Sequence, residues 1–224
     1  MLLTISGVLA TEQLQQIRTL MAGARFQDGR LSAGREANRV KHNEEMVQEQ
    51  ELYTRLNNIV MGSLVQHAVY QQAVLPHRVA APFYSRYVPG MDYGDHVDDP
   101  VMGPMGQRYR SDVSTTVFLS PPEDYEGGEL VIRSSFGEQR IKLAAGDAVV
   151  YPSSSTHHVA PVSAGERLVA VTWAQSLVRD PGRRELLYSL ARARDLLLEK
   201  SPDEHETALV SNSYTNLVRM WAEV

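Results

Sequence analysis

A series of short apolar runs between residues 79 and 174 most constrains the fold of this chain. Most of the runs carry several β-branched or aromatic residues, and Gly, Pro and Asp separate the runs, which is typical of β-strands joined by turns. The predicted strands are residues 82–88, 93–97, 112–119, 129–132, 139–143, 148–151, 157–162 and 167–174. Short strands with regularly spaced turns predict a mainly β fold, a sandwich or jelly roll, with its core at residues 76–178.

One of these runs, residues 112–119, predicts a sheet with two different faces. Val113, Thr115 and Val117 alternate with Ser114 and Thr116. Successive side chains of a strand leave opposite faces, so the two sets point to different surroundings.

Helices are expected before the strands, between residues 10 and 75. Apolar residues recur at helical spacing in residues 14–21 and again in 46–69, which predicts helices that pack on the outside of a sheet. Asn43, followed by two glutamates, is the predicted start of the second segment, because Asn is a favoured N-cap. That segment is either one long helix or two consecutive ones. Residues 27–43 are expected to be irregular.

Residues 179–224 form a predicted C-terminal helical module. Leucines at helical spacing predict a helix over 179–200, and the capping box Ser201-Pro202-Asp203-Glu204 predicts the start of a second. The chain is thus expected to divide into a domain of residues 1–178 and this module. The module packs on the β core or joins copies of the chain into a homo-oligomer.

Composition excludes several classes of function. The 224 residues are 43% hydrophobic with a net charge of −5 and show no basic stripe, which argues against a nucleic-acid partner. Disulfides and thiolate sites are excluded because the chain has no Cys. No apolar run reaches the ~20 residues that cross a bilayer, and the N-terminus lacks the basic residues of a signal peptide. We expect a cytoplasmic protein that does not bind membranes.

A candidate metal site begins at His96 and Asp98. Residues two apart on an extended segment leave the same face, so one imidazole nitrogen and one carboxylate oxygen can meet there. A second His from a distant strand would complete the 2-His-1-carboxylate set of Fe(II) oxygenases. His157 and His158 are both available, and because neighbours on a strand face opposite ways, only one can reach the metal. Spacing alone leaves both open.

A wider frame surrounds this pair. Tyr87, Gly90 and Tyr93 precede His96-x-Asp98 at regular intervals, and the run 152–162 and then Arg167 follow downstream. Together these features resemble the prolyl-4-hydroxylase-like branch of the Fe(II)/2-oxoglutarate dioxygenases. More narrowly, they resemble the bacterial PKHD-type hydroxylases, some of which are called iron-uptake factors.

The resemblance implies a double-stranded β-helix (jelly roll) and a set of site residues. It implies His96, Asp98 and His157 as catalytic iron ligands, the last by family register, with Arg167 and Tyr87 binding 2-oxoglutarate. A guanidinium suits this role because it makes two parallel hydrogen bonds to a carboxylate. L-Ascorbate is a further cofactor to consider.

The implied reaction hydroxylates a small molecule or peptide with O2 while 2-oxoglutarate is cleaved to succinate and CO2, with a link to iron uptake. Two alternatives stay open: a cupin-like metalloenzyme that does not use 2-oxoglutarate, and a non-catalytic β-barrel binding protein. The loop 99–110 is either a lid or a plain surface loop. Tyr93 is expected to face the organic substrate, and Thr115 and Trp173 either line the lumen or pack in the core.

Overall fold

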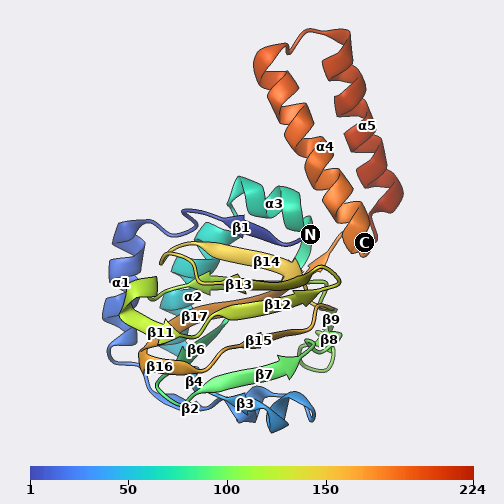
Figure 1. Ribbon diagram of the computed structural model, residues 1–224. Coiled ribbons are helices and arrows are strands. Elements are labelled where there is room, and N and C mark those ends of the chain that lie inside the picture. The colour runs from blue at the N-terminus through green and yellow to red at the C-terminus, as the bar shows by residue number, and fades with distance from the viewer.

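A computed structural model describes residues 1–224 and shows two facing antiparallel sheets (Figure 1). The strand order of the larger sheet is β1 (Leu3–Ile5), β14 (Ala148–Pro152), β10 (Val113–Phe118), β17 (Arg167–Ser176), β6 (Phe83–Tyr87), β4 (Glu44–Met46) and β2 (Phe26–Asp28), with β5 (Pro76–Val79) on β17. The order of the smaller sheet is β13 (Gly137–Ile141), β12 (Leu130–Ser134), β15 (His157–Val159), β7 (Asp92–His96) and β3 (Lys41–His42). Two ribbons complete the fold: β11 (Tyr125–Gly127) with β16 (Val162–Gly165), and β8 (Val101–Met102) with β9 (Tyr109–Arg110). The predicted jelly roll is confirmed, and seven of the eight predicted strands are present as single strands. The run 157–162 is instead divided into β15 and β16, which belong to different sheets.

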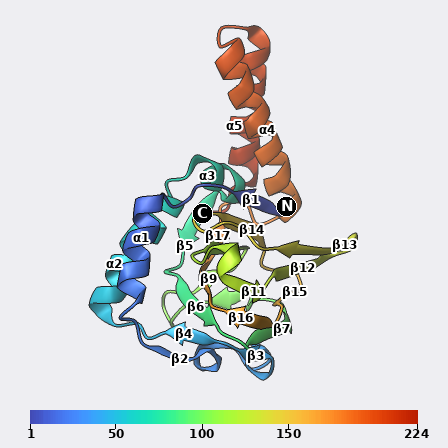
Figure 2. The same ribbon diagram turned by 60° about the vertical axis from the view of Figure 1, so that its left-hand side comes forward.

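Three helices cover the outer face of the larger sheet: α1 (Thr11–Met21), α2 (Gln50–Leu64) and α3 (Ala68–Val74) (Figure 2). Their buried side chains, such as Leu56 and Val60, pack against the sheet in the larger apolar cluster. Burying each such side chain contributes about 1.5–3 kcal/mol. The second predicted helical segment is two consecutive helices.

A second apolar cluster lies between the sheets, and strand β10 contributes to both clusters. Val113 and Val117 point to the helices, whereas Phe118 points between the sheets. The alternation predicted for this strand is confirmed. Its inner face therefore borders the interior of the jelly roll.

The helix predicted to start at Asn43 is wrong at its beginning. Residues 44–46 form β4, and α2 begins at Gln50. Glu44 forms an ion pair with Arg86 on the neighbouring strand, with 2.5 Å between Oε2 and Nη2. The edge of the larger sheet offers backbone partners that override the local helix signal. Residues 27–43, predicted to be irregular, contain the end of β2, two 3-10 turns (Gly29–Ser32 and Ala37–Arg39) and the whole of β3.

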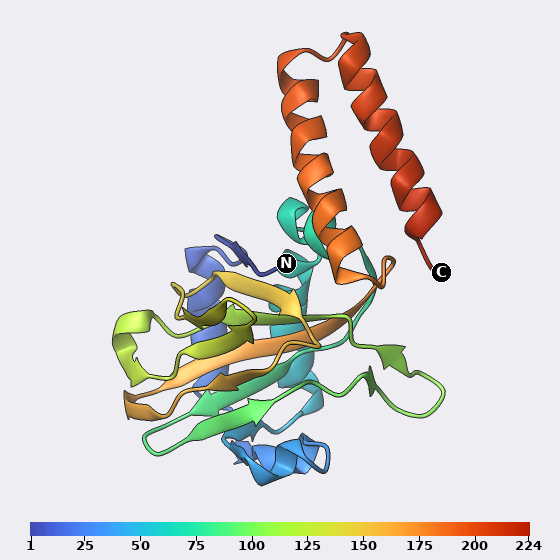
Figure 3. The same cartoon turned by 45° about the vertical axis from the view of Figure 1, so that its right-hand side comes forward.

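The C-terminal module is a hairpin of two helices, α4 (Pro181–Lys200) and α5 (His205–Trp221), which projects from the jelly roll (Figures 1 and 3). The capping box predicted at Ser201 is wrong. Ser201 instead ends α4, because its backbone N–H donates to Leu197 O, and its own carbonyl accepts from Thr207 Oγ1. None of the helices combines the length and apolar character that a bilayer crossing requires.

Candidate active site

A cavity of about 840 Å³ lies between the two sheets. All five site residues expected from the sequence line it: Tyr87, His96, Asp98, His157 and Arg167. They come from both sheets, so folding gathers into one space groups that are up to 80 residues apart in the chain (167 − 87 = 80). The cavity contains one cluster of metal-type donors and one buried cation that has no ion-pair partner.

The donor cluster is built on the pairing of β7 with β15. His96 ends β7, His157 begins β15, and the two are direct cross-strand partners with ring centroids 4.2 Å apart. Asp98 follows two residues after His96, and its Oδ1 is 3.9 Å from His157 Nε2. One donor atom from each of the three residues lies within 4.8 Å of the others. Side chains opposite each other in a ladder are held at such a separation by the backbone.

Both histidines are oriented by the same local contact. His96 Nδ1 is 2.8 Å from Gly94 O, and His157 Nδ1 is 3.0 Å from Ser155 O. A carbonyl only accepts hydrogen bonds, so each Nδ1 carries the proton and each neutral ring keeps a lone pair on Nε2. Burial, together with the neighbouring His157, lowers the pKa of His96 to about 4, so His96 is neutral at pH 7. Two imidazoles that each turn Nε2 away from the backbone carbonyl, together with one carboxylate, fit a divalent ion such as Fe(II).

His158 points to the opposite side of β15. Its Nδ1 is 2.8 Å from Asp95 Oδ1, and the other oxygen of Asp95 is 2.7 Å from Arg133 Nη1. It is absent from the lining of the cavity. His157, in contrast, is only 4% exposed and its ring lies against that of His96.

Arg167 is the buried cation. It is 1% exposed, yet its Nε and Nη1 have no hydrogen-bond partner and it forms no ion pair. Its guanidinium carbon lies 4.9 Å from the ring centre of Tyr87, its cross-strand partner, and 5.6 Å from that of Phe118. Leaving a buried charge uncompensated costs several kcal/mol, so this end of the cavity fits an anion.

A glycine makes room for the Arg167 side chain. A Cβ on Gly128 would lie 3.0 Å from Arg167 Cδ, and the φ of Gly128 is +66°. Both the space and the backbone conformation therefore favour glycine there.

Tyrosines form much of the surrounding wall. Burial raises the pKa of Tyr87 to about 12, so its phenol keeps its proton and can donate at neutral pH. Tyr93 lines the cavity and stacks on His96, with ring centroids 3.7 Å apart at an interplanar angle of 9°. Trp173 also lines the cavity, whereas Thr115 is fully buried outside it.

The chain is similar to known proteins along its whole length. Residues 82–175 match the 2OG-Fe(II) oxygenase superfamily, and residues 182–223 match the PKHD-type hydroxylase C-terminal domain. A PKHD-type hydroxylase of Thioalkalivibrio sulfidiphilus is 54% identical over 224 residues, which is the full length of both chains. One of Thermosynechococcus vestitus is 47% identical, again over both full lengths.

The chain belongs to the PKHD-type hydroxylase family.

Solved structures show the shared fold. A prolyl hydroxylase of Trichoplax adhaerens in complex with a hypoxia-inducible-factor peptide fragment superposes with a TM-score of 0.56 at 18% identity, covering 83% of this chain and 86% of that one. HygX of Streptomyces hygroscopicus, with nickel, 2-oxoglutarate and hygromycin B bound, gives a TM-score of 0.53 at 14% identity, covering 79% and 84%.

As a PKHD-type hydroxylase, the protein is an Fe(II)- and 2-oxoglutarate-dependent dioxygenase. The superfamily match sets aside both alternatives left open by the sequence, a cupin-like metalloenzyme without 2-oxoglutarate and a non-catalytic barrel.

The structure adds polar groups that the sequence did not single out. The Lys41 and Glu45 side chains form a buried ion pair in the cavity wall, with 2.5 Å between Nζ and Oε1. Two serines, Ser114 and Ser153, lie behind Asp98. The alternation in β10 could have indicated Ser114, because it shares the inner face with Phe118. Nothing local indicated Lys41, whose strand was expected to be irregular.

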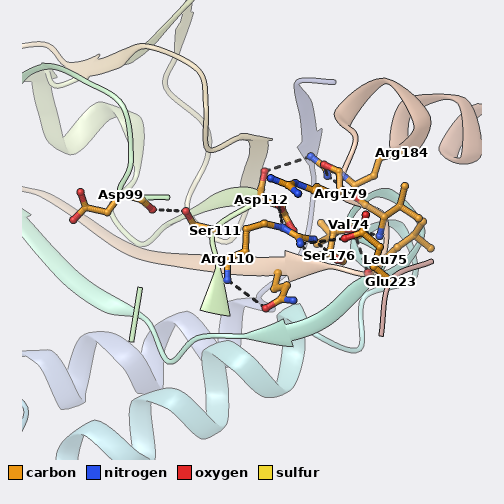
Figure 4. Close-up of polar contacts among 12 residues, drawn as sticks. Val74, Leu75, Asp99, Arg110, Ser111, Asp112, Ser176, Arg179, Arg184 and Glu223 are labelled. Atoms are coloured by element: carbon orange, nitrogen blue, oxygen red, sulfur yellow. Dashed lines mark hydrogen bonds and ion pairs between the residues drawn. The ribbon is translucent and has the colours of Figure 1, made fainter. Parts of the chain in front are cut away.

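The loop 99–110 forms the β8–β9 hairpin, and several of its residues line the cavity. Figure 4 shows the contacts that hold its base, where the Ser111 hydroxyl donates to Asp99 O. Arg110 lies 2.7 Å from Asp112 Oδ1 through Nε and 3.2 Å from Glu223 Oε2 through Nη1. The end of the chain is thus tied to the base of this hairpin. Its role as a lid stays a prediction.

Proposed function

We propose that His96, Asp98 and His157 hold the Fe(II) of this dioxygenase, and that Arg167 and Tyr87 bind the distal carboxylate of 2-oxoglutarate. The observation that carries the proposal is the unpaired guanidinium of Arg167, buried in the same cavity as the donor cluster. A cation without a partner at one end and three metal-type donors in the same cavity match a diacid that also chelates a metal.

Each residue has a defined task in this proposal. His96 and His157 present Nε2 lone pairs, and Asp98 adds one negative charge that offsets part of the charge of the metal. Arg167 makes two parallel N–H bonds that fix the direction of the bound diacid, and the Tyr87 phenol donates a third. The bound iron supplies the activation of O2 for 2-oxoglutarate cleavage and for hydroxylation of a C–H bond.

The organic substrate is proposed to be a small molecule or a short peptide. The cavity of about 840 Å³ is near the upper end of typical ligand pockets, and 2-oxoglutarate, a small diacid, fills only a part of it. Trp173 and Met102 offer apolar surface, and Lys41 and Glu45 offer charge, in the remaining wall. A cytoplasmic location, a link to iron uptake and a role for L-ascorbate stay predictions.

We also propose that copies of the chain associate through the C-terminal hairpin. Leu186 is 63% exposed on α4, and Leu209 is 53% exposed on α5. Light scattering should give a mass above 25.0 kDa for the wild type and a lower mass for Leu186→Glu/Leu209→Glu. Equal masses for the two proteins would contradict this proposal.

Anaerobic titration with Fe(II) and 2-oxoglutarate tests the metal site. His157→Ala should lose Fe(II) binding and the 2-oxoglutarate-dependent formation of succinate. His158→Ala is the matched control, because its ring bonds Asp95 outside the cavity, and it should keep both. Loss of metal in His158→Ala, with retention in His157→Ala, would refute the assignment.

A further inference from the structure

The carboxylate of Asp98 is engaged on the side away from the histidines. Its Oδ2 accepts a hydrogen bond from Ser114 Oγ at 2.5 Å, and Ser114 Oγ is 2.8 Å from Ser153 Oγ. Ser114 is 0% exposed and Ser153 is 2% exposed. The other oxygen, Oδ1, is the one that lies 3.9 Å from His157 Nε2. The two oxygens of Asp98 therefore have different surroundings.

The direction of these hydrogen bonds follows from the number of protons. An ionised carboxylate only accepts, so the single hydroxyl proton of Ser114 goes to Asp98 Oδ2. Ser114 then has no proton left for Ser153, and the Ser153 hydroxyl must donate to Ser114. The chain of donors runs from Ser153 to Ser114 to Asp98, and each step polarises the next.

This chain of hydroxyls connects the two sheets. Asp98 follows β7 of the smaller sheet, whereas Ser114 is on β10 of the larger sheet. Ser153 comes directly after β14, the neighbour of β10, and its backbone N–H donates to Asp112 O at 3.2 Å. The carboxylate is thus held by groups that the larger sheet fixes in place.

We propose that Ser114 and Ser153 are positioning residues that make Asp98 a one-oxygen ligand. The proposal rests on the ligand set proposed above. The Ser114 hydroxyl binds Oδ2 and holds that oxygen toward the larger sheet, so Oδ1, on the side of the histidines, is the oxygen presented to a metal. An octahedral ion has room for three protein donors, a two-point chelating diacid and O2 only if each protein donor takes a single position. A second bond from Asp98 would occupy the position that O2 needs.

Ser114→Ala removes the donor while keeping the side chain small and the fold intact. Hydrogen-bonded partners behind a metal ligand typically contribute 10–100-fold to metal affinity, so we expect Fe(II) to bind roughly 10- to 100-fold more weakly. Ser153→Ala leaves the bond from Ser114 to Asp98 in place but removes its support. It should cost less, roughly 2- to 10-fold, as expected for one neutral hydrogen bond.

Spectroscopy separates positioning from simple loss of stability. The Co(II)-loaded protein with 2-oxoglutarate should change its visible absorption in Ser114→Ala, because a carboxylate free to bind through both oxygens alters the coordination of the metal. Thr172→Val is the control, since it removes a buried hydroxyl of the same sheet that bonds Ala80 O and lies outside the cavity. Its spectrum and its metal affinity should match the wild type.

Asp98→Ala distinguishes failure of this inference from failure of the proposed function. If Asp98→Ala loses Fe(II) while Ser114→Ala keeps wild-type affinity and an unchanged Co(II) spectrum, the positioning role of the two serines is overturned and the ligand set stands. If Asp98→Ala keeps Fe(II), the ligand set itself is wrong, and the positioning role proposed for the two serines is wrong as well. The inference is supported if Ser114→Ala binds Fe(II) more weakly and changes the Co(II) spectrum. Ser153→Ala should then show a smaller loss of Fe(II) affinity.

Discussion

The buried guanidinium of Arg167 gives the sharpest test of the proposed site. Arg167→Met keeps a long side chain of similar shape but removes every donor. Two guanidinium nitrogens of Arg167, Nε and Nη1, have no partner in the protein, so the variant leaves no protein acceptor of theirs unsatisfied. Its effect should therefore fall on the ligand rather than on the fold.

The magnitude follows from the lost contacts. Two charge-assisted hydrogen bonds to a carboxylate contribute about 1.5–3 kcal/mol each, or roughly 3–6 kcal/mol together. Since 1.4 kcal/mol is a factor of ten, 2-oxoglutarate should bind roughly 10²- to 10⁴-fold more weakly to Arg167→Met. Arg167→Lys keeps the charge but not the two-pronged guanidinium, so its affinity for 2-oxoglutarate should lie between those of Arg167→Met and the wild type.

Calorimetric titration of 2-oxoglutarate into the Mn(II)-loaded protein measures this change without turnover. The ligand-free variant should unfold at the same urea concentration as the wild type or a higher one, because a buried unpaired charge costs stability. Arg86→Met is the matched control: Arg86 pairs with Glu44, lies outside the cavity, and should not matter for 2-oxoglutarate affinity. An affinity of Arg167→Met within about threefold of wild type would refute the reasoning, since one good bond alone exceeds that factor.

Three further perturbations test the surroundings of the site. The pKa of His96 is lowered to about 4 from an unfolded value of 6.5, so as the pH falls the unfolded chain takes up the proton first, and the free energy of unfolding of the metal-free protein should fall by up to ~3 kcal/mol between pH 6.5 and 4. In urea titrations across this pH range the stability of His96→Gln should change less than that of the wild type, and parallel profiles would contradict this. Gly128→Ala should cost about 1–2 kcal/mol and weaken 2-oxoglutarate binding, because its Cβ would meet Arg167 Cδ at 3.0 Å at a φ of +66°; unchanged urea midpoint and affinity would count against that crowding. Lys41→Met should destabilise the protein by about 3–5 kcal/mol by stranding the buried Glu45 carboxylate, and Lys41→Met/Glu45→Leu should recover most of that loss; a double variant as unstable as the single one would disprove the pairing.

Much of the β architecture was available from local patterns. Alternation in residues 113–119 predicted the two faces of β10, and both apolar clusters use it as expected. The strands predicted between residues 82 and 174 are present, except that the run 157–162 is divided into β15 and β16. The helix start predicted at Asn43 is wrong because residues 44–46 find backbone partners on β6, a contact between segments about 40 residues apart (85 − 45 = 40). Local propensity carries no information about such a partner.

At the site, the kinds of groups and their short-range spacing follow from the primary structure. The His96-x-Asp98 interval placed a nitrogen and an oxygen donor together, and the wider frame predicted the family that the comparisons establish. The spacing of these two donors is fixed by bond lengths and by the two-residue repeat of an extended chain, and neither requires a tertiary contact.

Which groups meet across the fold depends on long-range strand pairing and on how the two sheets pack. The pairing of β7 with β15 sets His157 opposite His96 and turns His158 toward Asp95. The packing of one sheet on the other places Ser114 behind Asp98. A shift of one residue in strand register would reverse every one of these directions, and register is set by the whole buried interface rather than by any local run of residues.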